Sequence, residues 1–322
     1  MTSQEAASTP RLLAVHAHPD DETLFNGLLL TKAARMGADV HVLTCTMGEE
    51  GEVIGEKYQN LVDPDQNPRG TGMLGGYRIS ELREALAALG VNELGVNNGT
   101  PHGPHFLGGV GRWRDSGMAG TPSIAREDAF SNPDREDNRQ EQIDQLIAVI
   151  EHIQPDVVAT YGPDGGYGHP DHIRAHQITH AAVEKMAATN NPAAPKQIIW
   201  CVTEKQRVDE VLATARGSEA PAGWRWPEEG DIAAVDSSDV DFVVHGTERD
   251  VAAKQAAMRA HATQIWVADG LSSDVNPESR DHEPVLYALS NLIAQPLLDT
   301  ESYTVGYTAG GVDDNYAATA WS

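Results

Sequence analysis

The sequence is poor in cysteine and in basic residues, and both shortages narrow the classes of protein it can encode. Cys45 and Cys201 are the only cysteines among 322 residues. Both lie in apolar runs, so we expect buried thiols rather than a disulfide framework. Lysine and arginine number 23 against 48 aspartates and glutamates, a formal net charge of −25. Such a surface repels phosphate backbones and anionic membranes, so we expect no binding to nucleic acid or membranes.

Long apolar segments are missing as well. No stretch reaches the roughly 20 apolar residues that cross a bilayer. Residues 1–10 are polar and lack the apolar centre of a secretory signal. We therefore expect a cytoplasmic protein. Its length of 322 residues allows one large domain or two ordinary ones.

The first part of the chain alternates between strand and helix patterns. Residues 12–16 form a short apolar run, residues 22–36 carry leucines at helical spacing, and residues 40–46 form a second apolar run. A strand–helix–strand unit implies parallel strands. The sequence predicts an α/β fold with a Rossmann-like, mostly parallel sheet flanked by helices. Further helices are expected at 79–89, 140–153, 172–187 and 248–261, and further strands at 156–161, 200–202 and 240–244, the last at a sheet edge.

The later part of the chain has weaker patterns. We expect residues 1–200 to form the Rossmann-like domain and residues 201–322 a smaller C-terminal α+β subdomain packed on it.

A long loop is expected in the first part of the chain, where residues 48–76 lie between two predicted elements and are polar and rich in glycine. A connection of this length is expected to carry a binding function.

Two histidine-rich segments follow apolar strands and suggest a metal site. Residues 18–22 read His-Pro-Asp-Asp-Glu, and residues 167–172 read Tyr-Gly-His-Pro-Asp-His. Open α/β sheets bind ligands beyond the carboxyl ends of their strands. His18, Asp21 and His172 would supply two imidazoles and one carboxylate and leave a position for water, which is typical of a catalytic metal.

The remaining polar groups of these segments fit a hydrolytic reaction. Asp20 is placed to accept a proton from water and to return it to a leaving amine. His169 and Tyr167 are candidates for donating to an oxyanion. A single His-Pro-Asp is also a common helix start, but two such segments in equivalent places are poorly explained by packing. Six other histidines are interpreted as structural, surface or loop residues outside the metal site: His41, His102, His105, His152, His180 and His245.

With these two motifs the chain resembles the zinc-dependent de-N-acetylases of the LmbE/PIG-L superfamily, which remove acetyl groups from N-acetylglucosaminyl compounds. Finer matches resemble the actinobacterial branch that acts on N-acetylglucosaminyl-inositol in mycothiol biosynthesis. The resemblance extends to about Gln264. The segments that carry these finer matches are 46–55, 75–79, 111–120 and 261–264.

The resemblance implies a role for each matching residue. His18, Asp21 and His172 would bind one Zn²⁺ per chain, with Fe²⁺ as the alternative. Asp20 would be the general base, and His169 and Tyr167 would stabilise the oxyanion.

Other matching residues imply the substrate contacts. Arg78 and Asp115 would bind the sugar, and Glu52 would lie near the inositol. Met118 would also contact the substrate. The chain departs from the family pattern in residues 97–106, which are longer and rich in His and Pro, and at Phe25, where a smaller residue is expected. Both departures concern the substrate entrance.

These observations predict hydrolysis of the N-acetyl group of a glucosaminyl-inositol, a small-molecule substrate, with release of acetate. One alternative is a mycothiol S-conjugate amidase, although residues 49–56 favour the deacetylase. The other alternative is a non-catalytic sugar-binding module. The presence of Asp20 disfavours it, because binding alone needs no second carboxylate beside that of Asp21. The oligomeric state stays open, with a homo-oligomer among the alternatives.

Overall fold

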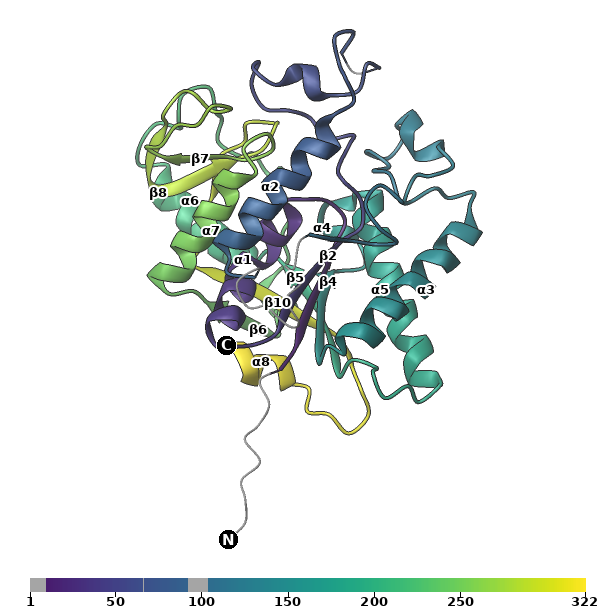
Figure 1. The fold of residues 1–322 in the computed structure, drawn as a ribbon. Coiled ribbons are helices and arrows are strands. Elements are labelled where there is room, and N and C mark those ends of the chain that lie inside the picture. Colours follow the sequence, from purple (N-terminus) through teal and green to yellow (C-terminus); the bar gives the residue numbers. More distant parts are fainter. Residues whose placement is uncertain (1–9, 66, 92–103) are drawn as a thin grey trace.

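A seven-stranded sheet forms the centre of the molecule within the residues that the computed structural model describes, which are 10–65, 67–91 and 104–322 (Figure 1). Its strands, in the order in which they lie side by side, are β3 (His105–Phe106), β2 (Val40–Thr44), β1 (Leu12–His16), β4 (Val157–Tyr161), β5 (Gln197–Val202), β10 (Thr300–Thr308) and β6 (Phe242–His245). The strands from β3 to β5 run parallel, and β10 is antiparallel to both of its neighbours. The prediction of an α/β fold with a mostly parallel sheet is confirmed.

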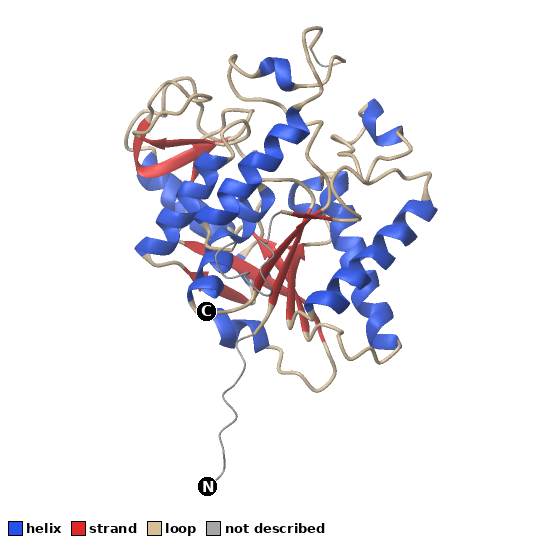
Figure 2. Ribbon diagram, viewed as in Figure 1, coloured by secondary structure: helices blue, strands red, loops and turns tan. Residues whose placement is uncertain are grey.

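Helices cover both faces of this sheet (Figure 2). The helices of the described residues are α1 (Asp21–Arg35), α2 (Leu74–Ala88), α3 (Glu136–Ile153), α4 (Gly165–Gly168), α5 (Pro170–Ala188), α6 (Lys205–Ala215), α7 (Glu248–Ala260) and α8 (Tyr316–Trp321). Figure 1 shows α3 and α5 on one side of the sheet and α1, α2 and α7 on the other. In the described residues, no helix is both long enough and apolar enough to cross a membrane.

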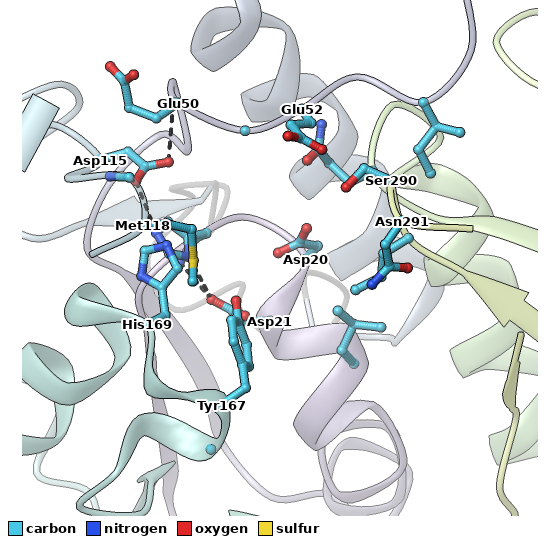
Figure 3. A pocket seen from close by; sticks show the side chains of 18 of the residues that line it. Asp20, Asp21, Glu50, Glu52, Asp115, Met118, Tyr167, His169, Ser290 and Asn291 are labelled. Carbon is cyan, nitrogen blue, oxygen red and sulfur yellow. Dashed lines mark hydrogen bonds and ion pairs between the residues drawn. The ribbon is translucent and has the colours of Figure 1, made fainter. Parts of the chain in front are cut away.

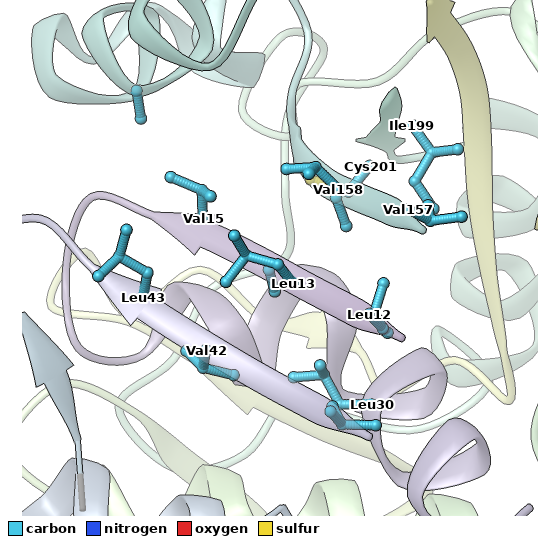
Figure 4. Packing of buried hydrophobic residues seen from close by; sticks show 14 of the residues in the cluster. Leu12, Leu13, Val15, Leu30, Val42, Leu43, Val157, Val158, Ile199 and Cys201 are labelled. Atoms are coloured by element: carbon cyan, nitrogen blue, oxygen red, sulfur yellow. The ribbon is translucent and has the colours of Figure 1, made fainter. Parts of the chain in front are cut away.

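The buried strands explain why the sheet forms where it does. Every residue of β1 and β4 is buried, as expected for parallel strands with helices on both faces. Leu12, Leu13, Val15 and Val158 pack into one apolar core with residues of β2 and β5 (Figure 4). The two motif-bearing segments therefore start from neighbouring strands of a rigid sheet.

The helix α2 begins five residues earlier than the sequence predicts. The expected helix starts at residue 79, because Gly75 and Gly76 suggest a loop, but α2 begins at Leu74. Gly75 is needed there for space: a Cβ atom would lie 2.7 Å from Cγ of Glu49. The glycine thus serves close packing inside the first turn of the helix.

The segment after residue 200 contributes to two sheets. β6 and β10 extend the large sheet, with β6 at its edge as predicted. A three-stranded antiparallel sheet consists of β7 (Trp266–Asp269), β8 (Asp281–Ala288) and β9 (Gln295–Pro296). A division into two domains at residue 200 stays a prediction.

Candidate functional site

The two histidine-containing segments meet because they leave adjacent strands. β1 ends at His16 and leads through residues 17–20 into α1, and β4 ends at Tyr161 and leads through α4 into α5. β1 and β4 are parallel neighbours, so the polar residues beyond their carboxyl ends converge. His169 is the N-cap of α5 and Pro170 its first residue, which fixes His172 one turn further on.

His18, Asp21 and His172 lie together and are buried. Nδ1 of His18 is 3.4 Å from Oδ2 of Asp21, and Nε2 of His172 is 3.3 Å from Oδ1 of the same carboxylate. Burial by itself raises the pKa of Asp21, but His172 and His18 hold that pKa well below its usual range. The carboxylate is therefore ionised and lies between two imidazoles.

This donor set fits a divalent cation. Nε2 of His172 is fully buried and has no hydrogen-bond partner within the described part of the chain, although it faces a carboxylate oxygen. Ring nitrogens of His18, His169 and His172 all lie within 4.8 Å of one another. Two imidazoles and a carboxylate are the ligands of a catalytic zinc site. An unpaired buried nitrogen is otherwise costly.

Asp171 orients His18 from the other side, a role that the two motifs did not predict. Its Oδ2 atom is 3.3 Å from Nε2 of His18. It also accepts hydrogen bonds from the Ser116 amide (2.9 Å) and the Ser131 hydroxyl (2.5 Å). A carboxylate on the second nitrogen of a histidine fixes the tautomer and the ring orientation. Its place between two histidines of the second motif was the signal that could have identified it.

Asp20 faces the cavity beside this cluster. Nη2 of Arg78 donates to its Oδ2 atom at 2.9 Å. Burial raises the pKa of Asp20, Arg78 lowers it and Asp21 raises it again, giving a pKa of about 6. A general base works best with a pKa near the operating pH, so the environment of Asp20 suits proton transfer.

His169 can donate a hydrogen bond toward the same space. Its Nδ1 atom accepts the backbone N–H of Asp171 at 3.1 Å, so the neutral ring carries its proton on Nε2. Burial and the neighbouring His18 lower the pKa of His169 to about 4. Tyr167 is half-exposed on the turn before it, with ring centroids 6.0 Å apart. Gly166 has a φ of 78° in this turn, a conformation that favours glycine.

A cavity of about 1480 Å³ opens over these groups. Figure 3 shows Asp115, Met118, His169 and Tyr167 at one end of it, with Asp20 between them and a wall that carries Glu52, Ser290 and Asn291. The predicted site residues that line this cavity are His18, Asp20, Asp21, Glu52, Arg78, Asp115, Met118, Tyr167 and His169. The loop between β8 and β9 supplies Ser290 and Asn291, which the weak patterns of the last 60 residues did not reveal.

Two of the predicted sugar-binding residues are themselves held by protein groups. Arg78 is 3% exposed and donates to the carbonyl oxygens of Gly48 and Pro19 as well as to Asp20. Asp115 is also 3% exposed and accepts the backbone N–H groups of Glu50 and Gly117. Burial raises the pKa of Asp115, but His18 nearby holds it far below its usual range.

The two departures from the family pattern are Phe25 and residues 97–106. Phe25 lines the cavity, and its ring meets those of Tyr161 and His172 edge to face. Residues 97–103, including His102, lie outside the described residues. His105 lies in β3 and is not among the described residues that line the cavity.

The chain is similar in sequence to deacetylases of known type. The model of the PIG-L family, described as GlcNAc-PI de-N-acetylase, matches residues 13–183. A protein of Corynebacterium jeikeium (strain K411), named 1D-myo-inositol 2-acetamido-2-deoxy-alpha-D-glucopyranoside deacetylase, is 53% identical over 336 aligned positions that cover 99% of this chain and 98% of the relative. A protein of the same name from Corynebacterium urealyticum (strain ATCC 43042 / DSM 7109) is 52% identical, with 95% and 88% covered. Among solved structures, N,N'-diacetylchitobiose deacetylase from Pyrococcus horikoshii aligns with a TM-score of 0.47 at 18% identity, covering 80% of this chain and 71% of that one.

Proposed function

The chain belongs to the PIG-L family of GlcNAc-PI de-N-acetylases, and on that premise we propose that it deacetylates 1D-myo-inositol 2-acetamido-2-deoxy-alpha-D-glucopyranoside. The products are glucosaminyl-inositol and acetate, in mycothiol biosynthesis. Two relatives that are more than half identical over nearly the whole chain carry the name of this activity. The observation that carries the proposal is the cluster of His18, Asp21 and His172 beside Asp20 in one cavity.

His18, Asp21 and His172 would hold one Zn²⁺ per chain, with Fe²⁺ as the alternative. The unpaired Nε2 atom of His172 and the carboxylate that it faces support this set. A bound divalent ion supplies a Lewis acid that polarises a carbonyl and lowers the pKa of water to about 7. Asp171 keeps the ring of His18 turned toward Asp21.

The chain's own residues carry the proton transfers. Asp20 accepts a proton from the attacking water, and the same carboxyl group returns a proton to the nitrogen of the leaving amine. The pKa of about 6 for Asp20 leaves it ionised at neutral pH. Nε2–H of His169 donates to the acetyl oxygen as negative charge develops there, assisted by the Tyr167 hydroxyl.

Asp115, Arg78, Met118 and Glu52 form the proposed substrate contacts. All four line the cavity, and charged groups bind sugar hydroxyls through charge-assisted hydrogen bonds. The acidic composition supports a small neutral substrate rather than a polyanion. A cytoplasmic location and a homo-oligomer stay predictions.

A second candidate is cleavage of mycothiol S-conjugates, which the size of the cavity favours. Its volume of about 1480 Å³ is larger than the roughly 300–1,000 Å³ that is usual for sites of small ligands. A bulkier amide substrate would therefore find room. The acidic segment that carries Glu52 supports the smaller inositol compound instead.

The experiment that tests the function compares the two amides on the purified, metal-loaded protein. Release of acetate from the N-acetylglucosaminyl-inositol is measured beside cleavage of a mycothiol S-conjugate, with N-acetylglucosamine as a third substrate. We expect the highest kcat/KM for the N-acetylglucosaminyl-inositol. A higher kcat/KM for the conjugate would replace the proposal with the amidase, and no hydrolysis of any amide would leave only a binding function.

A further inference from the structure

Asp20 has a backbone conformation that side chains other than glycine rarely adopt. Its φ is 127° and its ψ is −29°. Asp20 occupies the N-cap position of α1, yet its side chain makes no capping hydrogen bond. An aspartate at this position usually accepts an N–H of its own helix. Here the carboxylate points into the cavity instead (Figure 3).

Glu22 holds this conformation from within the first turn of α1. The backbone N–H of Asp20 donates to Oε2 of Glu22 at 3.0 Å. The other oxygen, Oε1, accepts the hydroxyl of Thr23. Glu22 is 0% exposed, so its carboxylate makes these contacts away from solvent.

His261 fixes Glu22 from a distant part of the chain. Its Nε2 atom is 2.7 Å from Oε1 of Glu22, and both residues are completely buried. His261 is the C-cap residue of α7, which packs against α1 and α2. Neither Glu22 nor His261 is among the described residues that line the cavity.

We propose that Glu22 and His261 are positioning residues for Asp20: the buried pair holds the backbone that directs the Asp20 carboxylate into the cavity. This inference depends on the proposed function, in which Asp20 is the base. Proton transfer needs the base within hydrogen-bond reach of the water. A displacement of about 1 Å can cost roughly 100-fold in rate, so the pair should affect kcat without touching the substrate.

A double-mutant cycle on the metal-loaded protein tests whether Glu22 acts through Asp20. Glu22→Ala is made in the wild-type and in the Asp20→Asn background, and kcat, KM and metal content are measured for all four proteins. In the wild-type background we expect kcat to fall about 10- to 100-fold with KM and metal content unchanged. In the Asp20→Asn background the same substitution should change kcat by less than about threefold, because residues that act through one group are not additive.

Conservative variants and a matched control separate positioning from damage to the fold. Glu22→Gln keeps an oxygen that accepts the Asp20 N–H, and His261→Gln keeps an N–H donor, so both should retain more activity than the alanine variants. If Glu22→Ala does not fold, His261→Ala replaces it in the same double-mutant cycle.

Glu81 is the matched control. It is buried and accepts the backbone N–H of Thr263 at 2.9 Å, two residues after His261. Glu81→Gln should keep kcat within about threefold of wild type, because the hydrogen bonds of Glu81 go to Thr263 and not to Glu22 or Asp20.

The outcomes distinguish this inference from the proposed function. An additive cycle, loss of metal in Glu22→Gln, or an equal loss of kcat in Glu81→Gln would overturn the positioning role and leave the deacetylase intact. Full activity of Asp20→Asn alone would contradict Asp20 as the base, and the positioning role with it. A non-additive cycle with metal retained supports both.

Discussion

Arg78 and Asp20 form an ion pair in which the arginine is buried and the aspartate partly buried, with 2.9 Å between Nη2 of the guanidinium and Oδ2 of the carboxylate. Arg78 also donates to the carbonyl oxygen of Gly48 at 2.8 Å. Its planar group thus connects α2 with the loops that follow β1 and β2. An arginine in this place affects the chemistry of Asp20 as well as any contact with a sugar.

The first prediction concerns the pH dependence of the reaction. Burial raises the pKa of Asp20 and Arg78 lowers it, giving a pKa of about 6. Arg78→Ala removes the lowering charge, so the pKa should rise. A base works only when deprotonated, and activity is lost as the pH falls through its pKa, so the variant should lose kcat/KM at a higher pH than wild type does. Arg78→Lys, which keeps the charge, is the control. An acidic limb that stays at the wild-type pH in Arg78→Ala would contradict this coupling.

The second prediction concerns metal binding. Wild-type protein should bind about one equivalent of divalent metal, and His172→Ala should lose most of it, because a catalytic zinc has only three protein ligands. His180→Ala is the matched control on the same helix, since His180 accepts a hydrogen bond from Trp200 at 2.9 Å instead. Elemental analysis of the purified variants checks this. Full metal content in His172→Ala would remove His172 from the ligand set.

The sequence predicts the parts of the fold that depend on local pattern. The bounds of β1 match the apolar run at residues 12–16, and α1 follows it as expected, because an apolar strand, a proline and an acidic helix start are all local signals. The position of β10 between β5 and β6 could not be predicted. It pairs with strands far away in the sequence, and such pairing leaves no local periodicity.

The same distinction applies to the site. The motifs predict that His18 and His172 lie together, because each directly follows a strand of the parallel sheet. The contacts of Asp171 and His261 could not be predicted, because each depends on a partner from another element of the fold. A sequence motif shows the chemical type of a side chain and its distance along the chain from other residues. It does not show which atom of another element that side chain contacts in the fold.

The third prediction concerns the oxyanion donor. Nδ1 of His169 accepts a backbone N–H, so only Nε2–H is free to donate. His169→Ala should lower kcat about 10²- to 10³-fold, the usual effect of one oxyanion donor, with metal content unchanged. His169→Gln offers an amide N–H at a similar reach and should keep more activity. Steady-state kinetics with metal analysis test both variants, and an unchanged kcat in His169→Ala would exclude the donor role.

The fourth prediction concerns stability and its dependence on pH. Asp250 is buried and accepts two hydrogen bonds of 2.9 Å from Arg35, which join α7 to α1, and it also closes the capping box of α7 with Thr247. Asp250→Asn should lower the free energy of unfolding at pH 7 by about 1–3 kcal/mol.

This difference should depend on pH in one direction. Burial raises the pKa of Asp250, but Arg35 and the Thr247 amide bring it below its usual value. A lowered pKa stabilises the fold above the unfolded pKa of about 3.9, and that contribution is lost as the pH falls through the folded pKa. Denaturation of both proteins should give a constant difference from about pH 5 to 8 that shrinks below about pH 4. Asp137→Asn, at an exposed pair with Arg135, should have no measurable effect.

The fifth prediction concerns the choice of substrate. Glu52 lies on the wall of the cavity near Ser290 and Asn291, across from His169 (Figure 3). Its carboxylate can accept hydrogen bonds from hydroxyls of an inositol ring, which simple N-acetylglucosamine lacks. Glu52→Ala should therefore lower kcat/KM for the N-acetylglucosaminyl-inositol about 10-fold, which corresponds to about 1.4 kcal/mol, as for one hydrogen bond to a charged group. Its kcat/KM for N-acetylglucosamine should stay the same.

Glu56 provides the control for this change. It is exposed on the same loop and is not among the described residues that line the cavity, so Glu56→Ala removes an equal charge without removing the proposed contact. It should leave both values of kcat/KM unchanged. If both variants lower kcat/KM for the inositol compound equally, the net charge of the loop and not a contact of Glu52 sets the preference. If Glu52→Ala lowers kcat/KM for both substrates by the same factor, Glu52 acts on the acetamido end, because a contact confined to the inositol cannot affect a substrate without one.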